Sequence, residues 1–305
     1  MAGRRQRGGW QVAWFLAGLS LLVPASARGE AEAIAVFPAE VRLSGPEALQ
    51  LVVVERVENG QAVSDVSAVA EAAIGDEGVV AMEEGRLVAR GNGATQVTFT
   101  VGEATATVDV VVDQFDEPFE WKFRSHVQAV LAKAGCNSGA CHGAQAGKNG
   151  FKLSLRGYDA PGDFETLTRR AGGRRIIPSD PGRSLLLLKP TGAVPHGGGL
   201  KLNVNSRDYR VLAEWIAQGT PGPRADDAAV ERIEMLPPAA ILGPGDVQQM
   251  VVLAHYSDGR TEDVTQWTKF AATNVPVADV DTDGRVEVTG YGEGSVTAWF
   301  SSQVT

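Results

Sequence analysis

The sequence predicts a multidomain chain in which two all-β sandwiches flank a small, mainly α domain. Three observations support this fold class. Short apolar runs that alternate with polar residues, separated by glycine turns, fill residues 33–112 and 230–305. These two stretches repeat one another. Between residues 113 and 224 the alternation is lost, and apolar residues recur at helical spacing instead. A chain of 305 residues is long enough for three domains of ordinary size.

The first β stretch, residues 33–112, predicts a small antiparallel sandwich. β-Branched residues dominate its apolar runs, which include Leu49–Val54, Val97–Val101 and Ala104–Val112. An Asn59-Gly60 pair separates two runs and is typical of a two-residue hairpin turn, because both residue types tolerate positive φ. Runs of this length and spacing fit the strands of a two-layer β domain.

The second β stretch, residues 230–305, copies the first at a near-constant offset of 199 positions. The matched pairs are Phe37-Pro38 with Leu236-Pro237, Gln50–Val53 with Gln249–Val252, Asn59-Gly60 with Asp258-Gly259, Asp65–Ser67 with Asp263–Thr265, and Gly91–Gly93 with Gly290–Gly292. We therefore expect two copies of one domain. The second copy reaches Thr305 where the last strand is expected, so we expect an N-terminal fragment of a longer protein.

The repeat resembles bacterial Ig-like domains of group 2. The resemblance rests on the opening proline, on Tyr256–Gly259, on the turn Asp263–Thr265, and on the Gly-x-Gly that precedes a Val-Thr strand. It implies Ig-like sandwiches that act as spacers or adhesion modules, with a cell-surface or glycan partner. It implies no chemistry, because such folds carry many functions. Neither copy offers a catalytic set, so whether the protein is an enzyme stays open, with redox activity in a further C-terminal region as one interpretation.

Residues 1–27 are typical of a signal peptide. Arg4, Arg5 and Arg7 precede an apolar core at Val12–Val23, and Ala25-Ser26-Ala27 supplies small residues for cleavage. The core is shorter than the ~20 residues of a membrane span. We expect an exported protein, periplasmic or on the cell surface, with an uncleaved N-terminal anchor as the rival interpretation.

The charge of the chain is unevenly distributed. The net charge is −9, yet residues 113–224 carry 16 Lys and Arg against 10 Asp and Glu. Residues 33–112 carry 4 against 12, and residues 225–305 carry 4 against 13. A basic segment between acidic neighbours indicates a separate domain with its own ligand or partner. No aromatic-interleaved basic motif is present, so we expect no nucleic-acid partner.

Residues 113–224 predict the helical domain. Phe123, Val127, Val130, Leu131 and Ala134 share one face of a helix that ends at Gly135. A second helix is predicted over Arg207–Gln218, with Ser206 as its N-cap and Gly219 and Pro221 after its end. Leu185–Leu188 predicts a further helical turn after Pro181-Gly182.

Both cysteines of the chain lie in Cys136-Asn137-Ser138-Gly139-Ala140-Cys141-His142, directly after the first predicted helix. In c-type haem attachment, two thiols form thioethers with the haem vinyl groups and the following histidine binds iron. Here four residues separate the cysteines, whereas two is usual. We interpret this segment as a c-type haem attachment site. One alternative is a Cys136–Cys141 disulfide in a cell-surface scaffold protein without haem, and another is a catalytic Cys/His dyad.

The iron ligand opposite His142 is predicted to be His196. Met82, Met235 and Met250 all fall in the β stretches, so the middle segment contains no methionine. His196 lies in Pro195-His196-Gly197-Gly198-Gly199, where glycines allow the backbone to approach a flat macrocycle. Two histidine ligands favour a lower reduction potential than a Met ligand gives. The rivals are His126, expected on a partly exposed helix face, and a five-coordinate iron.

Residues 121–219 resemble the planctomycete-type cytochrome c domain. The resemblance rests on Ala134–Cys136, Ala140–Gly143, Gly150–Leu153, Asp180-Pro181 with Ser184–Leu186, Val194–Gly199 and the Trp215-Ile216 helix. It implies one covalent haem c held at Cys136, Cys141 and His142, and electron transfer to a redox partner protein or an attached C-terminal domain. We expect the pairs Arg169-Arg170 and Arg174-Arg175 to face haem propionates or an acidic partner, with solvated loop charges as the alternative.

One segment imitates a calcium site. Asp279–Gly284 matches the opening of an EF-hand loop, but the twelfth position, where a bidentate carboxylate is needed, is Gly290. We therefore expect a strand and a turn here rather than a metal loop.

Overall fold

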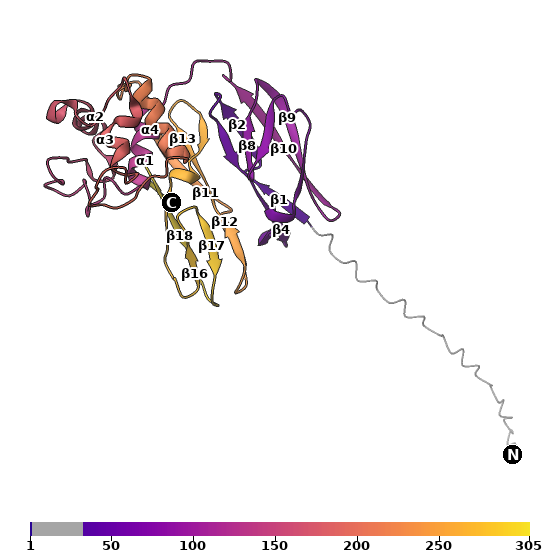
Figure 1. Cartoon of the computed structure of the whole chain (residues 1–305). Helices are drawn as coiled ribbons and strands as arrows, with labels where there is room; N and C mark the ends of the chain where they lie inside the picture. The colour runs from indigo at the N-terminus through magenta and orange to yellow at the C-terminus, as the bar shows by residue number, and fades with distance from the viewer. Residues whose placement is uncertain (2–32) are drawn as a thin grey trace. The chain divides into compact units, whose positions relative to one another are not determined.

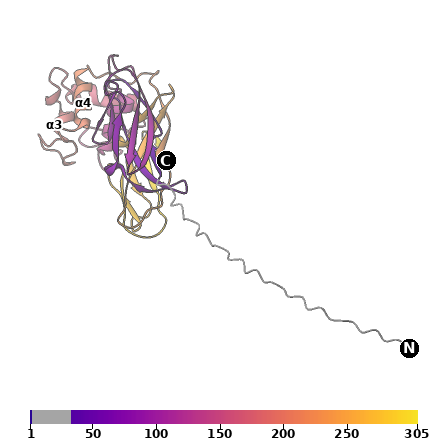
Figure 2. The same cartoon turned by 90° about the vertical axis from the view of Figure 1, so that its right-hand side faces the viewer.

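The structure is a computed structural model that describes Met1 and residues 33–305. The predicted signal peptide, residues 1–27, lies almost wholly outside the described residues. Residues 32–305 form one compact unit. In sequence order this unit contains a β region, a helical region and a second β region, and the four labelled helices come from the middle of the chain (Figures 1 and 2).

The first β region contains ten strands in three sheets. Their orders are β1-β4-β5, β2-β10-β9-β6 and β3-β8-β7. All pairs are antiparallel except β2 with β10, which is parallel. The bounds are β1 Ala33–Phe37, β2 Glu40–Ser44, β3 Leu49–Leu51, β4 Val53–Glu58, β5 Gln61–Asp65, β6 Glu71–Ile74, β7 Val80–Glu83, β8 Arg86–Ala89, β9 Gly93–Val101 and β10 Ala104–Asp113.

These sheets enclose one apolar core. Along β10, Val108, Val110 and Val112 are buried while the residues between them are more exposed, as period-two alternation requires. They pack in one cluster with Leu87 of β8 and Phe99 of β9. Separate sheets around a shared core are consistent with the predicted β-sandwich.

The second β region contains nine strands, again in three sheets, ordered β11-β13-β14, β12-β17-β16 and β15-β18-β19. All its pairs are antiparallel. The bounds are β11 Val230–Leu236, β12 Val247–Gln249, β13 Val251–Tyr256, β14 Thr261–Asp263, β15 Lys269–Ala272, β16 Ala278–Val280, β17 Arg285–Val288, β18 Val296–Phe300 and β19 Gln303–Val304.

Two of the three sheets have the same strand order in both β regions, as the internal repeat predicts, and the third sheet differs because β2 has no counterpart in the second region. The sheet β1-β4-β5 corresponds to β11-β13-β14, and β3-β8-β7 corresponds to β12-β17-β16. A turn device also recurs: the Asp65 carboxylate accepts the Ser67 amide, and the Asp263 carboxylate accepts the Thr265 amide. Each hydroxyl in turn accepts a strand amide, from Val54 in the first copy and from its counterpart in the second.

The same two aspartates also join the β regions to each other. Asp65 Oδ2 accepts the Gln249 amide at 2.9 Å, and Asp263 Oδ2 accepts the Leu51 amide at 2.6 Å. A small apolar cluster lies at this interface, formed by Leu51, Val53, Leu236, Val251 and Leu253. Because each copy supplies the same kind of acceptor to a strand of the other, the contact is nearly reciprocal.

The helical region consists of short helices and turns. A π-helical turn spans Phe123–Val127 and continues into α1, Gln128–Lys133. The other α-helices are α2 Ala160–Thr168, α3 Leu185–Leu188 and α4 Arg207–Ala217, with 3₁₀ turns at Leu155–Gly157, Arg170–Gly173 and Pro181–Arg183. Further 3₁₀ turns lie in the β regions, at Ser67–Val69 and Thr265–Trp267.

Three of the four α-helices match the predicted positions. Ser206 Oγ accepts the Tyr209 amide and caps α4, as expected. Helix α2 was not predicted. Asp159 caps it by accepting the Gly162 amide, and proline is well suited to the first turn of a helix.

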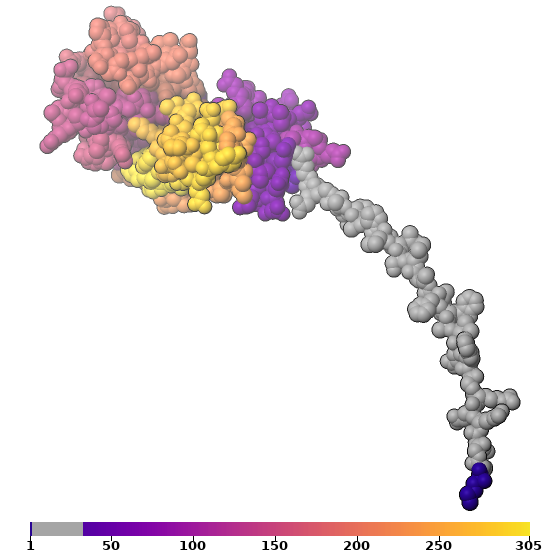
Figure 3. All heavy atoms as spheres, turned by 90° about the horizontal axis from the view of Figure 1, so that it is seen from below, coloured from indigo at the N-terminus to yellow at the C-terminus, as the bar shows by residue number. Residues whose placement is uncertain are grey.

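The helical region shares its core with the second β region. Trp215 and Val127 belong to the same buried cluster as Trp267, Val264 and Phe300. Figure 3 shows the second β region, orange to yellow, against both the helical region and the first β region. The helical region is therefore fixed to its neighbour by apolar packing.

The calcium-loop imitation folds as a strand and turn, as predicted. Ala278–Val280 is β16, and Asp281 Oδ1 accepts the amides of Asp283 and Arg285. This carboxylate is used to close the hairpin to β17.

Candidate functional site

A cavity in the helical region brings all four predicted site residues together. Its volume is about 600 Å³, within the range of small-molecule and cofactor sites. Cys136, Cys141, His142 and His196 all line it. Its apolar wall includes Val130, Leu131, Leu185, Leu186, Leu202 and Leu212, from α1, α3, α4 and the preceding loop.

The segment Cys136–Gly143 is a compact loop closed by its own backbone. Gly135 ends the first helix at φ +76°, and the Cys136 amide donates to the Leu131 carbonyl at 2.8 Å. The His142 amide donates to the Cys136 carbonyl at 2.9 Å. The backbone carbonyl of Ser138 accepts hydrogen bonds from the amides of Cys141 and Gly143, so the extra residues between the cysteines fold as a turn. A Cβ on Gly143 would overlap the Asn137 carbonyl, which is why glycine is needed there.

Both cysteines are free thiols in the structure. Burial raises the pKa of Cys136 to about 11, and the neighbouring Cys141 adds to this effect. Cys136 therefore stays protonated at neutral pH.

His142 is oriented by the carbonyl of Phe151. Its Nδ1 lies 3.1 Å from that oxygen, so the proton belongs on Nδ1, where it is donated to the carbonyl. The two rings are in contact, with centroids 4.3 Å apart. Burial lowers the pKa of His142, and His196 and Arg175 lower it further, although the Phe151 carbonyl opposes them. A neutral ring with Nδ1 engaged leaves Nε2 available as a ligand atom.

His196 is oriented in the same way by its own loop. Its Nδ1 lies 2.9 Å from the Gly199 carbonyl. The ring folds back over Gly198, where an added Cβ would lie 3.0 Å from Cε1 and 3.2 Å from Nε2. Lys189 Nζ donates to the Pro195 carbonyl and fixes the start of this loop. The missing side chain of Gly198 therefore leaves room for the imidazole ring.

The two imidazoles face the cavity as a pair. Their centroids are 6.4 Å apart and their planes are 11° from parallel. Metal–nitrogen bonds to histidine are about 2.0–2.1 Å, so two imidazoles that bind one metal from opposite sides place their centroids about 6 Å apart. Metal-binding histidines also typically donate the other ring N–H to a carbonyl, as both of these do.

Over residues 33–305, no set of three or more His, Cys, Asp or Glu side chains is arranged to hold a metal ion. A porphyrin supplies its own four nitrogens, so haem iron needs only axial ligands from the chain. Two thiols and two imidazoles, each oriented by a backbone carbonyl, line one cavity and fit covalent haem.

His126 does not lie at this cavity, and the expectation that it is partly exposed is wrong. It is buried, its Nδ1 accepts the Lys122 amide, and its Nε2 lies 3.4 Å from Glu262 of the second β region. Its ring packs against Trp121 and Trp267. Contact with a neighbouring region buried it, which helical periodicity alone does not reveal.

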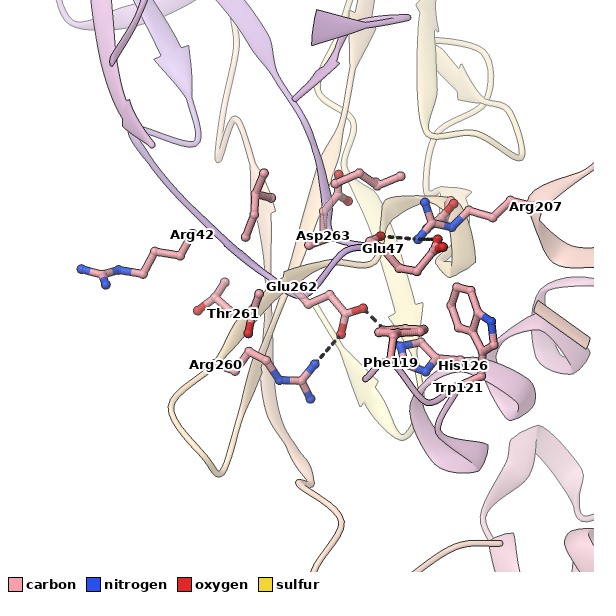
Figure 4. Close-up of a pocket in the computed structure, with 15 residues that line it drawn as sticks. Arg42, Glu47, Phe119, Trp121, His126, Arg207, Arg260, Thr261, Glu262 and Asp263 are labelled. Carbon is pink, nitrogen blue, oxygen red and sulfur yellow. Dashed lines mark hydrogen bonds and ion pairs between the residues drawn. The ribbon is translucent and has the colours of Figure 1, made fainter. Parts of the chain in front are cut away.

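A second, smaller pocket surrounds that histidine. Its volume is about 40 Å³, and all three regions line it (Figure 4). Glu47 of the first β region accepts two hydrogen bonds from the Arg210 guanidinium and one from Arg207 through its carbonyl. Because these contacts join the first β region to α4, we interpret the pocket as a structural junction.

The two arginine pairs behave differently from one another. Arg174 and Arg175 line the cavity, whereas Arg169 and Arg170 do not. Arg175 is buried and donates to the carbonyls of Gly150, Thr166 and Arg170, so its role is to hold loops together. Its guanidinium also lies 4.6 Å from the centre of the Phe151 ring.

Phe151 is the functional residue that sequence reasoning missed. It orients His142 through its carbonyl and packs on the ring. Every residue type has a backbone carbonyl, so the residue type of Phe151 does not reveal this contact. The one sequence signal was its place in Gly150–Leu153, a segment on which the cytochrome c resemblance rests. Trp215 is buried in the core of the helical region, and the partly buried Tyr209 packs against that core.

No family model matches the chain, and no curated protein matches it. Among solved structures it is similar to surface layer protein SbsC, domains 1–6, with 8% sequence identity and a TM-score of 0.22. The match covers 90% of this chain and 27% of that one, so this chain spans about a quarter of that structure's length.

Proposed function

We propose that this protein is an exported c-type haem protein. Its helical region, which lies in the chain between two Ig-like spacer or adhesion domains, would transfer single electrons to or from a partner. The observation that carries the proposal is the pair His142 and His196. They line one cavity with both cysteines, and each has its Nδ1 tied to a backbone carbonyl.

The chain's own residues would hold the cofactor as follows. Cys136 and Cys141 would hold the haem through two thioethers, each made by addition of an S–H across a vinyl C=C without oxidation or reduction. His142 and His196 would bind the iron. When bound, haem supplies a reversible one-electron iron couple. The leucines of the cavity wall exclude water, and the Phe151 and Gly199 carbonyls hold each imidazole in the tautomer that leaves Nε2 free.

The proposed ligand set predicts a low reduction potential. A methionine ligand would raise it, and residues 113–224 contain none. The four-residue interval between the cysteines is compatible with attachment, because the turn at Ser138–Cys141 takes up the extra length and the His142 amide still reaches the Cys136 carbonyl.

Export and display are also part of the proposal. The segment 1–27 is typical of a signal peptide. Among the described residues, no helix has the length and apolar character needed to cross a membrane. We infer a periplasmic or cell-surface location, with a redox partner protein or a further attached domain as the electron partner.

A pyridine-haemochrome spectrum, together with an intact mass, tests the proposal on protein made in a host with haem-maturation machinery. We expect a c-type spectrum and a mass increase of one haem. The Cys136→Ser/Cys141→Ser variant is the control and should lose both. A polypeptide mass lower by two hydrogens, with no Soret band, would instead support the scaffold protein with a Cys136–Cys141 disulfide.

A further inference from the structure

The cavity that holds the thiols and histidines is surrounded by positive charge. Lys148, Arg174, Lys189 and Lys201 line it and are exposed, and we call these four residues the basic rim. None of the residues that line the cavity is an aspartate or glutamate. This is unusual placement in a chain whose net charge is −9.

The basic rim is not neutralised by ion pairs within the described part of the chain. The ion pairs of the helical region involve other cations: Arg207 and Arg210 pair with Glu47, Arg210 also with Glu214, Lys122 and Arg224 with Glu120, Arg170 with Glu165, and His126 with Glu262. Lys189 is engaged only with a carbonyl, that of Pro195. Unpaired cations gathered at one opening produce a local positive potential despite the negative net charge.

Cations outside the rim extend the same field. Burial lowers the pKa of Lys269, and the nearby charges of Arg156 and Lys201 lower it further. Lys269 begins β15 of the second β region, so a residue from outside the helical region adds to the positive potential near the two cysteines.

An apolar contact accompanies the charge. Leu200 is 71% exposed and stands between Gly199 and Lys201, in the loop that carries His196. Transient electron-transfer interfaces are small, and charge complementarity gives them speed and orientation more than affinity. Leu200 provides an apolar contact from which a partner can exclude water. The neighbouring lysines attract a negatively charged partner to the same opening.

We propose that the basic rim is the docking surface for an acidic electron-transfer protein, which exchanges electrons with the cofactor of this cavity. The proposal rests on the proposed haem function. Both β regions are acidic, at 4 basic against 12 acidic residues and 4 against 13, and so repel the same partner. Attraction at the rim and repulsion elsewhere would orient the encounter toward the cavity.

Binding is tested first, by a readout that does not depend on haem. Fluorescently labelled polyglutamate is titrated against the protein at low ionic strength. The rim variant is Lys148→Glu/Arg174→Glu/Lys201→Glu. The matched control is Arg124→Glu/Arg169→Glu/Arg183→Glu, which changes the net charge equally at exposed sites that do not line the cavity. We expect roughly tenfold weaker binding for the rim variant and little change for the control.

Equal losses in the two triple variants would overturn the proposal, because binding would then follow net charge alone. Vesicles of anionic phosphatidylglycerol form a third arm. If they bind the rim at a concentration of negative charge where polyglutamate does not, the surface serves a membrane and the acidic-protein proposal fails. Circular dichroism melts of both variants exclude loss of folding as the cause.

Electron exchange is tested next on protein with a verified haem. Stopped-flow oxidation of the reduced protein by hexacyanoferrate(III), an anion, should slow as salt is added, whereas oxidation by the cation tris(phenanthroline)cobalt(III) should speed up. In the rim variant the opposite salt dependences of the two oxidation rates should disappear or be reversed, whereas the control variant should keep them. A rate with hexacyanoferrate(III) that salt leaves unchanged would sink the proposal. Absence of a Soret band would refute the haem function, while the polyglutamate assay would still report on the surface.

Discussion

The buried carboxyl of Glu55 in the first β region accepts a hydrogen bond from the side-chain amide of Gln248 in the second. Each partner keeps one buried atom without a hydrogen bond, Oε2 of Glu55 and Oε1 of Gln248. A proton on the Glu55 carboxyl would provide a donor for the Gln248 oxygen. The pair therefore fits a neutral Glu55 better than a charged one.

Glu55 should make the protein less stable as pH rises. Burial raises its pKa from 4.5 to about 7; the Gln248 bond opposes this, and Asp65 adds to it. The folded state then holds a proton that the unfolded state releases, so the stabilisation present below pH 4.5 is lost as pH rises through about 7. Glu55→Gln should recover at most about 3 kcal/mol at pH 8.

Chemical denaturation of this variant between pH 4.5 and 8 provides the measurement. Glu58→Gln, an exposed position on the same strand, is the control and should leave the pH profile unchanged. A wild-type profile that is flat between pH 4.5 and 8 would contradict a neutral Glu55.

Glu262 should make the protein less stable as pH falls. Burial alone would raise its pKa, but the hydrogen bond and charge of His126, with the charge of Arg260, outweigh burial and lower the pKa from 4.5 to about 2. Its stabilisation is present above pH 4.5 and is lost as pH falls toward 2, by at most about 3 kcal/mol. The free energy of urea unfolding should fall less between pH 4.5 and 2 in the Glu262→Gln variant than in the unmodified protein. The control Glu287→Gln, at an exposed strand position, should not change this fall. A steep acid limb in both variants would show that other carboxyls dominate.

Gly143 should be essential to the shape of the attachment loop. Gly143→Ala places a methyl group against the Asn137 carbonyl, whereas Gly139→Ala, in the same loop, meets nothing within 4 Å. We expect the first variant to lose most covalent haem, measured by haem-stained gels and intact mass, and the second to retain it. Similar yields from both variants would mean that the loop tolerates a shift of its backbone.

His196→Ala should change the iron spin state without loss of attached haem. The thioethers depend on Cys136 and Cys141, while His196 is proposed as an axial ligand. The visible spectrum and low-temperature electron paramagnetic resonance should change from low-spin to high-spin iron. His126→Gln, at a buried site away from the cavity, should leave the spectrum low-spin. A low-spin His196→Ala protein would refute His196 as the ligand.

The two thiols should differ in reactivity in the haem-free protein. Burial raises the pKa of Cys136 to about 11, so it holds little thiolate at pH 8 and should resist iodoacetamide. Peptide mapping after brief alkylation should find Cys141 labelled first. Raising the pH toward 11 should accelerate labelling of Cys136, and equal labelling at pH 8 would contradict its shielding.

Local patterns predicted most of the fold. Alternation and the 199-residue offset indicated two copies of a β domain, and two of the three sheets have the same strand order in both β regions. Helical periodicity and an N-cap serine located α4 correctly. Helix α2 was missed because it begins with a proline and a glycine, which sequence patterns associate with turns. In the structure Asp159 caps the helix and Leu167 is buried.

The sequence by itself determined which residues are candidates for the haem chemistry, because Cys136, Cys141 and His142 lie within seven positions of the chain whatever the fold. Only the tertiary structure decided how distant residues meet. It placed His196 beside His142 with parallel rings, and it buried His126 against Glu262 of another region. It also used Arg175 to hold loops and left Lys201 exposed at the cavity. Sequence patterns report each element's own periodicity, whereas side-chain roles depend on which elements pack together, and that is decided by long-range burial.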